Sequence, residues 1–196
     1  MAENNEKHIS EFMLSEYNHI SSAHFEVAKQ VTSFFRYYLL IMSAPAFLIF
    51  YFDKEPQKID RLLYGDITSI NYFIFWLLII ISIIGFFICL YIINKKFTGI
   101  LYAQTVNGVR NYFVKNATTD VSAFLVLPTV LNKPKYFQFT SLFLIFPFAI
   151  INSSLISFAF WIINYNCACK IFGITFFILH IITYVIWAKL KDKKNK

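Results

Sequence analysis

The chain has 196 residues, of which 58% are hydrophobic and 15% are charged, whereas soluble domains average roughly 45–50% and about 25%. With 24 phenylalanines, five glycines and three cysteines, it is not a disordered chain, a collagen-like fibre or a disulfide-rich secreted scaffold. The formal net charge of +7 suggests a nucleic-acid partner, but the placement of the basic residues has a simpler explanation, given below. The composition indicates a membrane protein.

In chain order, the first predicted element is a polar helix over residues 10–33, which contains no proline or glycine. Its apolar and aromatic residues recur three or four positions apart, the heptad-like spacing with which one helix packs along another. This seam consists of Met13, Tyr17, Ile20, His24, Val27, Val31 and Phe34. It predicts a helix that runs on into the first membrane span and pairs with a second helix, a second copy or a soluble partner.

Four segments are long and apolar enough to cross a membrane, which takes about 20 helical residues. They cover approximately residues 34–52, 72–93, 139–163 and 171–188. Their apolar runs are continuous, whereas the strands of a membrane barrel alternate apolar and polar residues. The sequence therefore predicts an all-α membrane protein with four transmembrane helices, forming a single domain over residues 1–196.

The second span is expected to continue as a helix into the connection 94–138, which holds six basic residues and one acidic residue. The segment before the first span is acidic by comparison, so we expect the two extensions, 10–33 and 94–138, to pair as an antiparallel hairpin in the cytoplasm. Asn107–Gly108 is a weak point at which this helix can bend. After Asp120, two prolines are expected to end it.

The third and fourth spans carry the polar residues that lie deep in the membrane. These residues are Asn152, Ser153, Ser157 and His180. They allow two interpretations: a polar surface that lines a pore, or a neutral imidazole hydrogen-bonded to Asn152 or Ser153 on the neighbouring helix, which is the simpler one. No span contains an aspartate or a glutamate, which argues against a carboxylate proton relay and against most ion-coupled transporters.

Four basic residues define a candidate cytoplasmic surface: Lys95, Lys96, Arg110 and Lys115. With nearby tyrosines they have the composition of a nucleotide or RNA site. However, 14 of the 18 lysines and arginines lie in residues 1–36, 94–138 and the tail after 188, as the positive-inside rule requires when both termini are cytoplasmic. We therefore expect no direct nucleic-acid binding.

The chain shows no constellation of catalytic residues, no zinc-type cluster and no phosphate-binding glycine loop. We predict that it is not an enzyme and that it binds neither a metal nor a cofactor. Cys167 and Cys169 lie in the short outer turn between the last two spans, where they can be free thiols or cross-link two copies. The first 33 residues lack the pattern of a cleavable signal peptide, so the first span is expected to direct insertion.

Several strings resemble a broad family of small four-span bacterial membrane proteins. They are EYN at 16–18, FFRYYLLI at 34–41, LYAQTVNGVRNYF at 101–113, LP at 127–128 and INS at 151–153. In size, layout and richness in Lys, Asn, Ile and Phe, the chain also resembles the membrane accessory protein of type VI-B CRISPR loci, and less closely the membrane subunit of the Kiwa defence system. This resemblance implies a multi-pass protein of the bacterial inner membrane that takes part in antiviral defence. It assigns no functional residue.

We therefore expect an accessory or effector protein that works as a homo-oligomer in the lipid bilayer. Two mechanisms stay open. In one, several copies line a pore with the polar residues of the last two spans. In the other, the cytoplasmic hairpin is a scaffold that holds a cytosolic nuclease or sensor, with the seam residues as its partner surface. A small transporter or channel unrelated to defence is the alternative.

Overall fold

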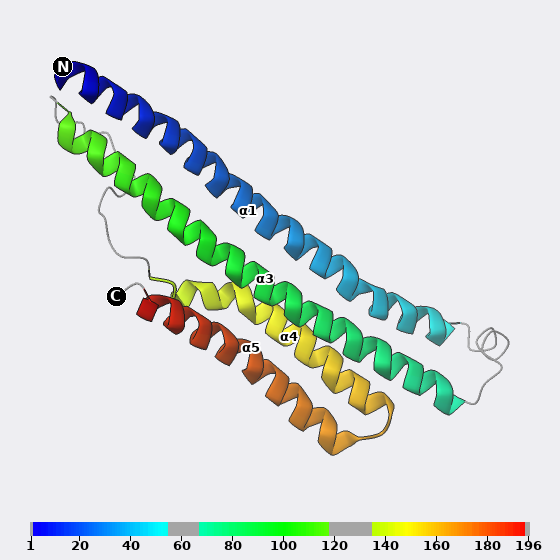
Figure 1. Cartoon of the computed structure of the whole chain (residues 1–196). Helices are drawn as coiled ribbons and strands as arrows, with labels where there is room; N and C mark the ends of the chain where they lie inside the picture. Colours follow the sequence, from blue (N-terminus) through cyan, green and yellow to red (C-terminus); the bar gives the residue numbers. More distant parts are fainter. Residues whose placement is uncertain (1, 55–66, 118–134, 195–196) are drawn as a thin grey trace.

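The computed structural model describes residues 2–54, 67–117 and 135–194, without the side chains of residues 2–7, 46, 48–54 and 67–70. These residues form helices α1 (Ala2–Lys54), α3 (Ile67–Asn116), α4 (Phe139–Ile162) and α5 (Asn166–Lys194), and no strand occurs among them (Figure 1). The predicted all-α fold is thus confirmed. The non-helical stretch predicted after Asp120 falls largely in residues 118–134, outside the described part of the chain.

Helices α1 and α3 are 53 and 50 residues long, so each combines a predicted span and its extension in one unbroken helix. The bend expected at Asn107–Gly108 does not end α3, which stays helical to Asn116. On the same stretch, Val106 and Val109 are buried. Glycine in a helix costs about 1 kcal/mol relative to alanine, and the burial of these two side chains outweighs that cost.

Figure 1 shows α1 and α3 lying side by side and antiparallel, with the shorter α4 and α5 packed along one half of this pair. We call the four-helix half the bundle, and the remainder, residues 2–33 of α1 and 98–116 of α3, the arm. The Ala2 end of α1, the Asn116 end of α3 and the Lys194 end of α5 all point toward the same end of the molecule.

The arm is held together by the predicted seam. Ile20 and Val27 are buried, and the other seam residues are half-buried. About halfway along the α1 part of the arm, Arg110 donates a hydrogen bond to the Tyr17 hydroxyl at 3.2 Å. Charge complementarity contributes no ion pair here, since the one ion pair found in the described ranges, His8–Glu11, lies within α1. The seam is therefore engaged inside the chain, and a partner could use these residues only by displacing α3.

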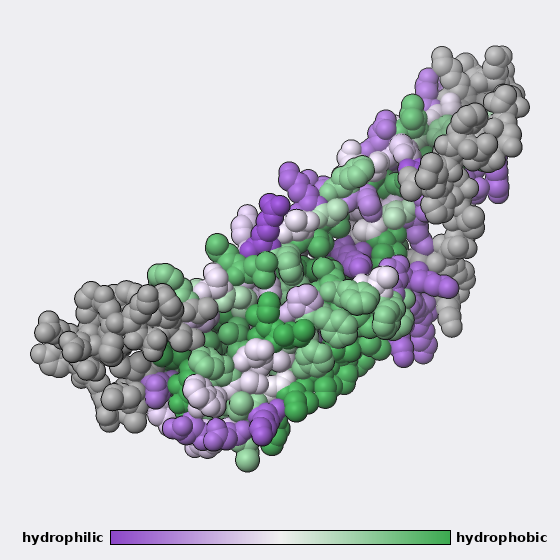
Figure 2. All heavy atoms as spheres, turned by 180° about the vertical axis from the view of Figure 1, so that it is seen from behind, coloured by the Kyte–Doolittle hydropathy of each residue, from purple (hydrophilic) through white to green (hydrophobic). Residues whose placement is uncertain are grey.

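The outside of the bundle is apolar. Helices α3, α4 and α5 are each long and hydrophobic enough to cross a membrane, and only 22–39% of the residues in their most apolar stretches are buried. On the face drawn in Figure 2, hydrophobic residues cover the bundle and hydrophilic residues gather toward the arm. A surface this apolar fits lipid rather than water. In the first predicted span, 34–52, the side chains of residues 46 and 48–52 are outside the described set. The structure therefore supports three of the four predicted spans.

The last turns of α5 hold the extended segment that leads into α4. Asp192 accepts hydrogen bonds from the backbone N–H groups of Tyr136, at 2.7 Å, and Phe137, at 3.2 Å. The Tyr184 hydroxyl accepts a third, from the N–H of Gln138, at 3.1 Å. The acidic residue in the otherwise basic tail thus satisfies two backbone donors just before a helix begins.

We predict that Asp192→Ala lowers the free energy of unfolding in detergent by about 1–3 kcal/mol, because it leaves two N–H groups without their charged acceptor. Denaturant titration followed by circular dichroism measures the change. Lys193→Ala, an exposed neighbour in the same tail, should lie within about 0.5 kcal/mol of the parent chain. Equal effects of the two substitutions would contradict this role of Asp192.

Candidate functional site

Four polar residues, one from each helix, meet in the centre of the bundle. They are Tyr38 of α1, Ser82 of α3, Asn152 of α4 and His180 of α5, and each is at most 1% exposed. We call this cluster the polar hub. Polar groups are costly in hydrocarbon unless they are hydrogen-bonded, so their gathering at one point requires that they pair with one another.

The hub is connected through Asn152. The Tyr38 hydroxyl donates to Asn152 Oδ1 at 3.2 Å, and Asn152 Nδ2 lies 2.9 Å from His180 Nε2. Ser82 Oγ donates to the backbone carbonyl of Asn152 at 2.9 Å. His180 Nδ1 in turn lies 2.8 Å from the carbonyl oxygen of Phe176. A single asparagine is thus bonded to all three other helices.

The acceptor groups determine where the protons lie. The Phe176 carbonyl can only accept, so we assign the ring proton of His180 to Nδ1. Nε2 then accepts from the Asn152 amide, whose oxygen is left to accept from Tyr38. In this arrangement every bond has one donor and one acceptor, and the imidazole is neutral. This is the simpler of the two interpretations drawn from the sequence.

Close packing surrounds the hub. A Cβ atom placed on Gly85 of α3 would overlap Asn152 Oδ1 and Met42 Cε, so only glycine lets α3 approach this closely. The rings of Phe86 and Phe176 both contact the His180 ring edge-on, with centroids 4.9 Å away. The imidazole is therefore enclosed by aromatic rings on the sides that do not carry hydrogen bonds.

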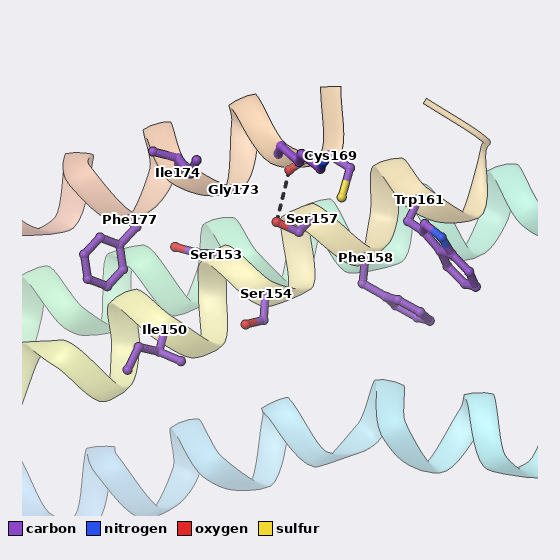
Figure 3. A pocket seen from close by; sticks show the side chains of 11 residues that line it. Ile150, Ser153, Ser154, Ser157, Phe158, Trp161, Cys169, Gly173, Ile174 and Phe177 are labelled. Carbon is purple, nitrogen blue, oxygen red and sulfur yellow. Dashed lines mark hydrogen bonds between the residues drawn. The ribbon is translucent and has the colours of Figure 1, made fainter. Parts of the chain in front are cut away.

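The serines of α4 lie apart from the hub. Ser153 Oγ donates to the Ala149 carbonyl, and Ser157 Oγ donates to the Cys169 carbonyl of α5 at 3.1 Å (Figure 3). Both line an open groove of about 680 Å³ between α4 and α5, together with Ser154, which is exposed. The groove is otherwise mostly apolar, with Phe158, Trp161, Ile174 and Phe177 among its lining residues.

The predicted polar surface of the last two spans is therefore divided in the single chain. Asn152 and His180 are closed inside the bundle, whereas Ser153 and Ser157 line the groove. The reason is rotational: a helix turns by about 100° per residue, so neighbouring polar residues point to different partners. The predicted pore is one lined by several copies, and it stays a prediction.

The four basic candidates do not form a compact patch. They extend along about 30 Å of α3, and each has different surroundings. Lys95 lies over the Tyr91 ring, 5.3 Å from its centroid, and Arg110 binds Tyr17 in the arm. Lys115 is exposed near the end of α3, and Lys96 is half-buried in a separate cleft. The four residues are thus separate basic side chains along α3.

Within the described ranges, no group of three or more His, Cys, Asp or Glu side chains could hold a metal ion. The three cysteines are free thiols, Cys89 buried, Cys167 exposed and Cys169 half-exposed. The hub has hydrogen-bond chemistry only, and its one imidazole is already engaged on both nitrogens. The arrangement is suited to holding helices together.

Three members of the site were missed by sequence reasoning: Tyr38, Ser82 and Gly85. Tyr38 belongs to a run of aromatic residues at the start of a span, and Ser82 and Gly85 read as small packing residues. Only the small size of Ser82 and Gly85, one helical turn apart in an apolar span, signals a close helix contact.

Comparison of the chain with protein-family models, with curated proteins and with solved structures finds no match. The geometry described above is therefore the basis for the functional argument.

We predict that Tyr38→Phe destabilises the bundle by about 0.5–1.5 kcal/mol, because Asn152 Oδ1 loses its donor. A double-mutant cycle with Asn152→Leu, measured by unfolding in detergent, should give a coupling energy of about 0.6–1.7 kcal/mol. Tyr37→Phe is the matched control, since Tyr37 is 60% exposed. A coupling energy of zero would show that the Tyr38–Asn152 bond contributes nothing.

We further predict that Gly85→Ala lowers the free energy of unfolding by about 1–3 kcal/mol, because the new methyl group would displace Asn152 or Met42. At Gly99, the nearest atom to an added Cβ is Val27 Cγ1 at 3.5 Å, an ordinary contact. Gly99→Ala should therefore be neutral or stabilise by up to about 1 kcal/mol. A lower melting temperature for Gly99→Ala than for Gly85→Ala would overturn this account of Gly85.

Proposed function

We propose that this chain is a non-enzymatic membrane scaffold, which spans the bacterial inner membrane four times and holds a cytosolic partner at the membrane through its arm. The observation that carries the proposal is the continuity of α1 and α3, which run from the bundle to the end of the arm without a break. Two helices that are anchored in lipid and packed on each other form a stiff support. The part of α1 beyond the bundle extends over about 45 Å.

The fourth span and the orientation belong to this proposal. Helix α1 passes alongside α4, because Tyr38 is bonded to Asn152 and lies 4.3 Å, ring to ring, from Phe148. Its outward residues at this level, Leu40 and Phe47, are 72% and 68% exposed, as expected for side chains that contact lipid. The positive-inside rule then places the arm and both termini in the cytoplasm.

Large apolar side chains on the arm support a docking role. Phe12 and Phe25 are 66% and 70% exposed, although both lie outside the predicted spans. In water, such exposed phenylalanines favour contact with another protein. They lie on faces of α1 other than the buried seam, so they are accessible while the hairpin stays closed. A partner therefore need not displace α3.

The resemblance to the accessory protein of type VI-B CRISPR loci indicates which partner to test first, the RNA-guided ribonuclease of such a locus. A pore assembled from several copies is the competing mechanism within the same defence role. Because Asn152 and His180 are closed inside each chain, its lining would have to come from the α4–α5 groove and Ser154.

The test is co-expression with the neighbouring ribonuclease, followed by membrane flotation. We expect Phe12→Ser with Phe25→Ser to lower the membrane-bound fraction of the nuclease by roughly tenfold, since burial of one phenylalanine contributes about 1.5–3 kcal/mol. The scaffold itself should remain in the membrane. Glu11→Gln with Glu26→Gln alters exposed neighbours of the two phenylalanines and should retain the nuclease.

Membrane potential in the same cells separates the two mechanisms. A scaffold leaves the potential unchanged in the parent chain and in Ser154→Leu. Depolarisation by the parent chain that disappears in Ser154→Leu, with the nuclease soluble throughout, would falsify the scaffold and favour a pore.

A further inference from the structure

A second cleft, of about 350 Å³, lies where the arm meets the bundle. Three helices contribute to its wall. Its lining consists of His24, Val27, Ala28 and Val31 of α1, Lys96, Gly99, Ile100 and Ala103 of α3, and Leu144 of α4. Small residues on the facing helices, Ala28, Gly99 and Ala103, leave the space between α1 and α3 open. The cleft is apolar except for two basic side chains, His24 and Lys96.

The Lys96 side chain is partly removed from water, and no acidic side chain in the cleft balances its charge. It is half-buried, and burial lowers the pKa of its ammonium group. None of the lining residues is acidic, and Lys96 forms no ion pair with another described residue. Its neighbour Lys95 is placed differently, over the Tyr91 ring and outside the cleft. An anion in the cleft would supply the charge that Lys96 lacks.

The Lys96 end of the cleft lies at the level of the phosphate layer of a bilayer. Its α1 residues precede the first predicted span by three to ten positions, and its α3 residues follow the second span by the same number. At 1.5 Å per residue, Val31 and Lys96 lie about 5 Å outside the hydrocarbon edge, and His24 lies about 15 Å outside it. Lipid headgroups occupy roughly the first 5–8 Å outside that edge, so Lys96 lies within the headgroup layer and His24 lies beyond it. Leu144, inside the third predicted span, brings the apolar wall up to the hydrocarbon.

We propose that this cleft binds an anionic phospholipid from the leaflet on the arm side, with its phosphate held by Lys96 and an acyl chain against Val31 and Leu144. Basic pockets between membrane helices on the cytoplasmic side are suited to such headgroups. The proposal rests on the membrane position of the bundle and does not depend on any partner of the arm. It gives the arm a lipid-sensitive joint, because the bound molecule would contact both of its helices.

Native mass spectrometry of the full chain in detergent tests this with two probes, phosphatidylglycerol and the zwitterionic phosphatidylcholine. We expect retention of phosphatidylglycerol over phosphatidylcholine. Lys96→Gln should weaken phosphatidylglycerol binding by roughly tenfold. The matched variant Lys95→Gln removes the same charge one residue away and should change binding by no more than about twofold. Gly99→Leu, which fills the cleft without altering charge, should weaken binding as Lys96→Gln does.

Three results would overturn the proposal. The first is an equal loss for Lys95→Gln and Lys96→Gln, which means general attraction to a basic surface. The second is unchanged phosphatidylglycerol binding in both Lys96→Gln and Gly99→Leu. The third is a rise in melting temperature when inorganic phosphate or ATP is added to the chain in detergent micelles that contain phosphatidylcholine, if this rise depends on Lys96 and phosphatidylglycerol does not produce it. That outcome identifies a soluble anion as the ligand. Release of a nuclease from the arm has no bearing on these measurements.

Discussion

The bundle depends on the hydrogen bonds of Asn152 to the three other helices. In a membrane, apolar contacts between helices are little better than contacts with lipid, so apolar residues alone do not select one helix arrangement. Asn152 does so because each of its groups can be satisfied in one place only: Oδ1 by α1, Nδ2 by α5 and the backbone carbonyl by α3. Gly85 provides the room for this approach. One residue thereby determines the rotation and height of all four helices.

The same constraint reaches the arm, since α1 and α3 are continuous. Once Tyr38 is bonded in the hub, the pairing of the two helices is set turn by turn. Phe34 contacts Tyr91, with ring centroids 4.4 Å apart, and Tyr17 meets Arg110 some 25 Å further along. The basic cleft lies between these two contacts. A ligand there would act on the part of the hairpin that connects the membrane bundle to the exposed phenylalanines.

Much of the fold could be predicted from sequence because its signals are local. Apolar runs of about 20 residues locate spans, and the spacing of Ile20 and Val27 identifies the face of α1 that packs on α3. The hub could be predicted only in part. Asn152 and His180 are conspicuous because polar groups are rare in hydrocarbon, whereas Tyr38 and Ser82 are unremarkable until the helices are rotated against one another. Asp192 gave no local signal, because its partners lie more than 50 residues away.

The internal bonding of the hub also bears on where function can reside. A water path through one chain would have to open the bonds of Tyr38, Asn152 and His180, each of which has its donor and acceptor already matched. In place of these bonds, water would have to enter a core closed by Phe86 and Phe176. The interior is thus committed to holding the helices in register. In the described part of the chain, the groups left available to other molecules are at the surface: the exposed phenylalanines of the arm, the basic cleft and the groove beside Ser154.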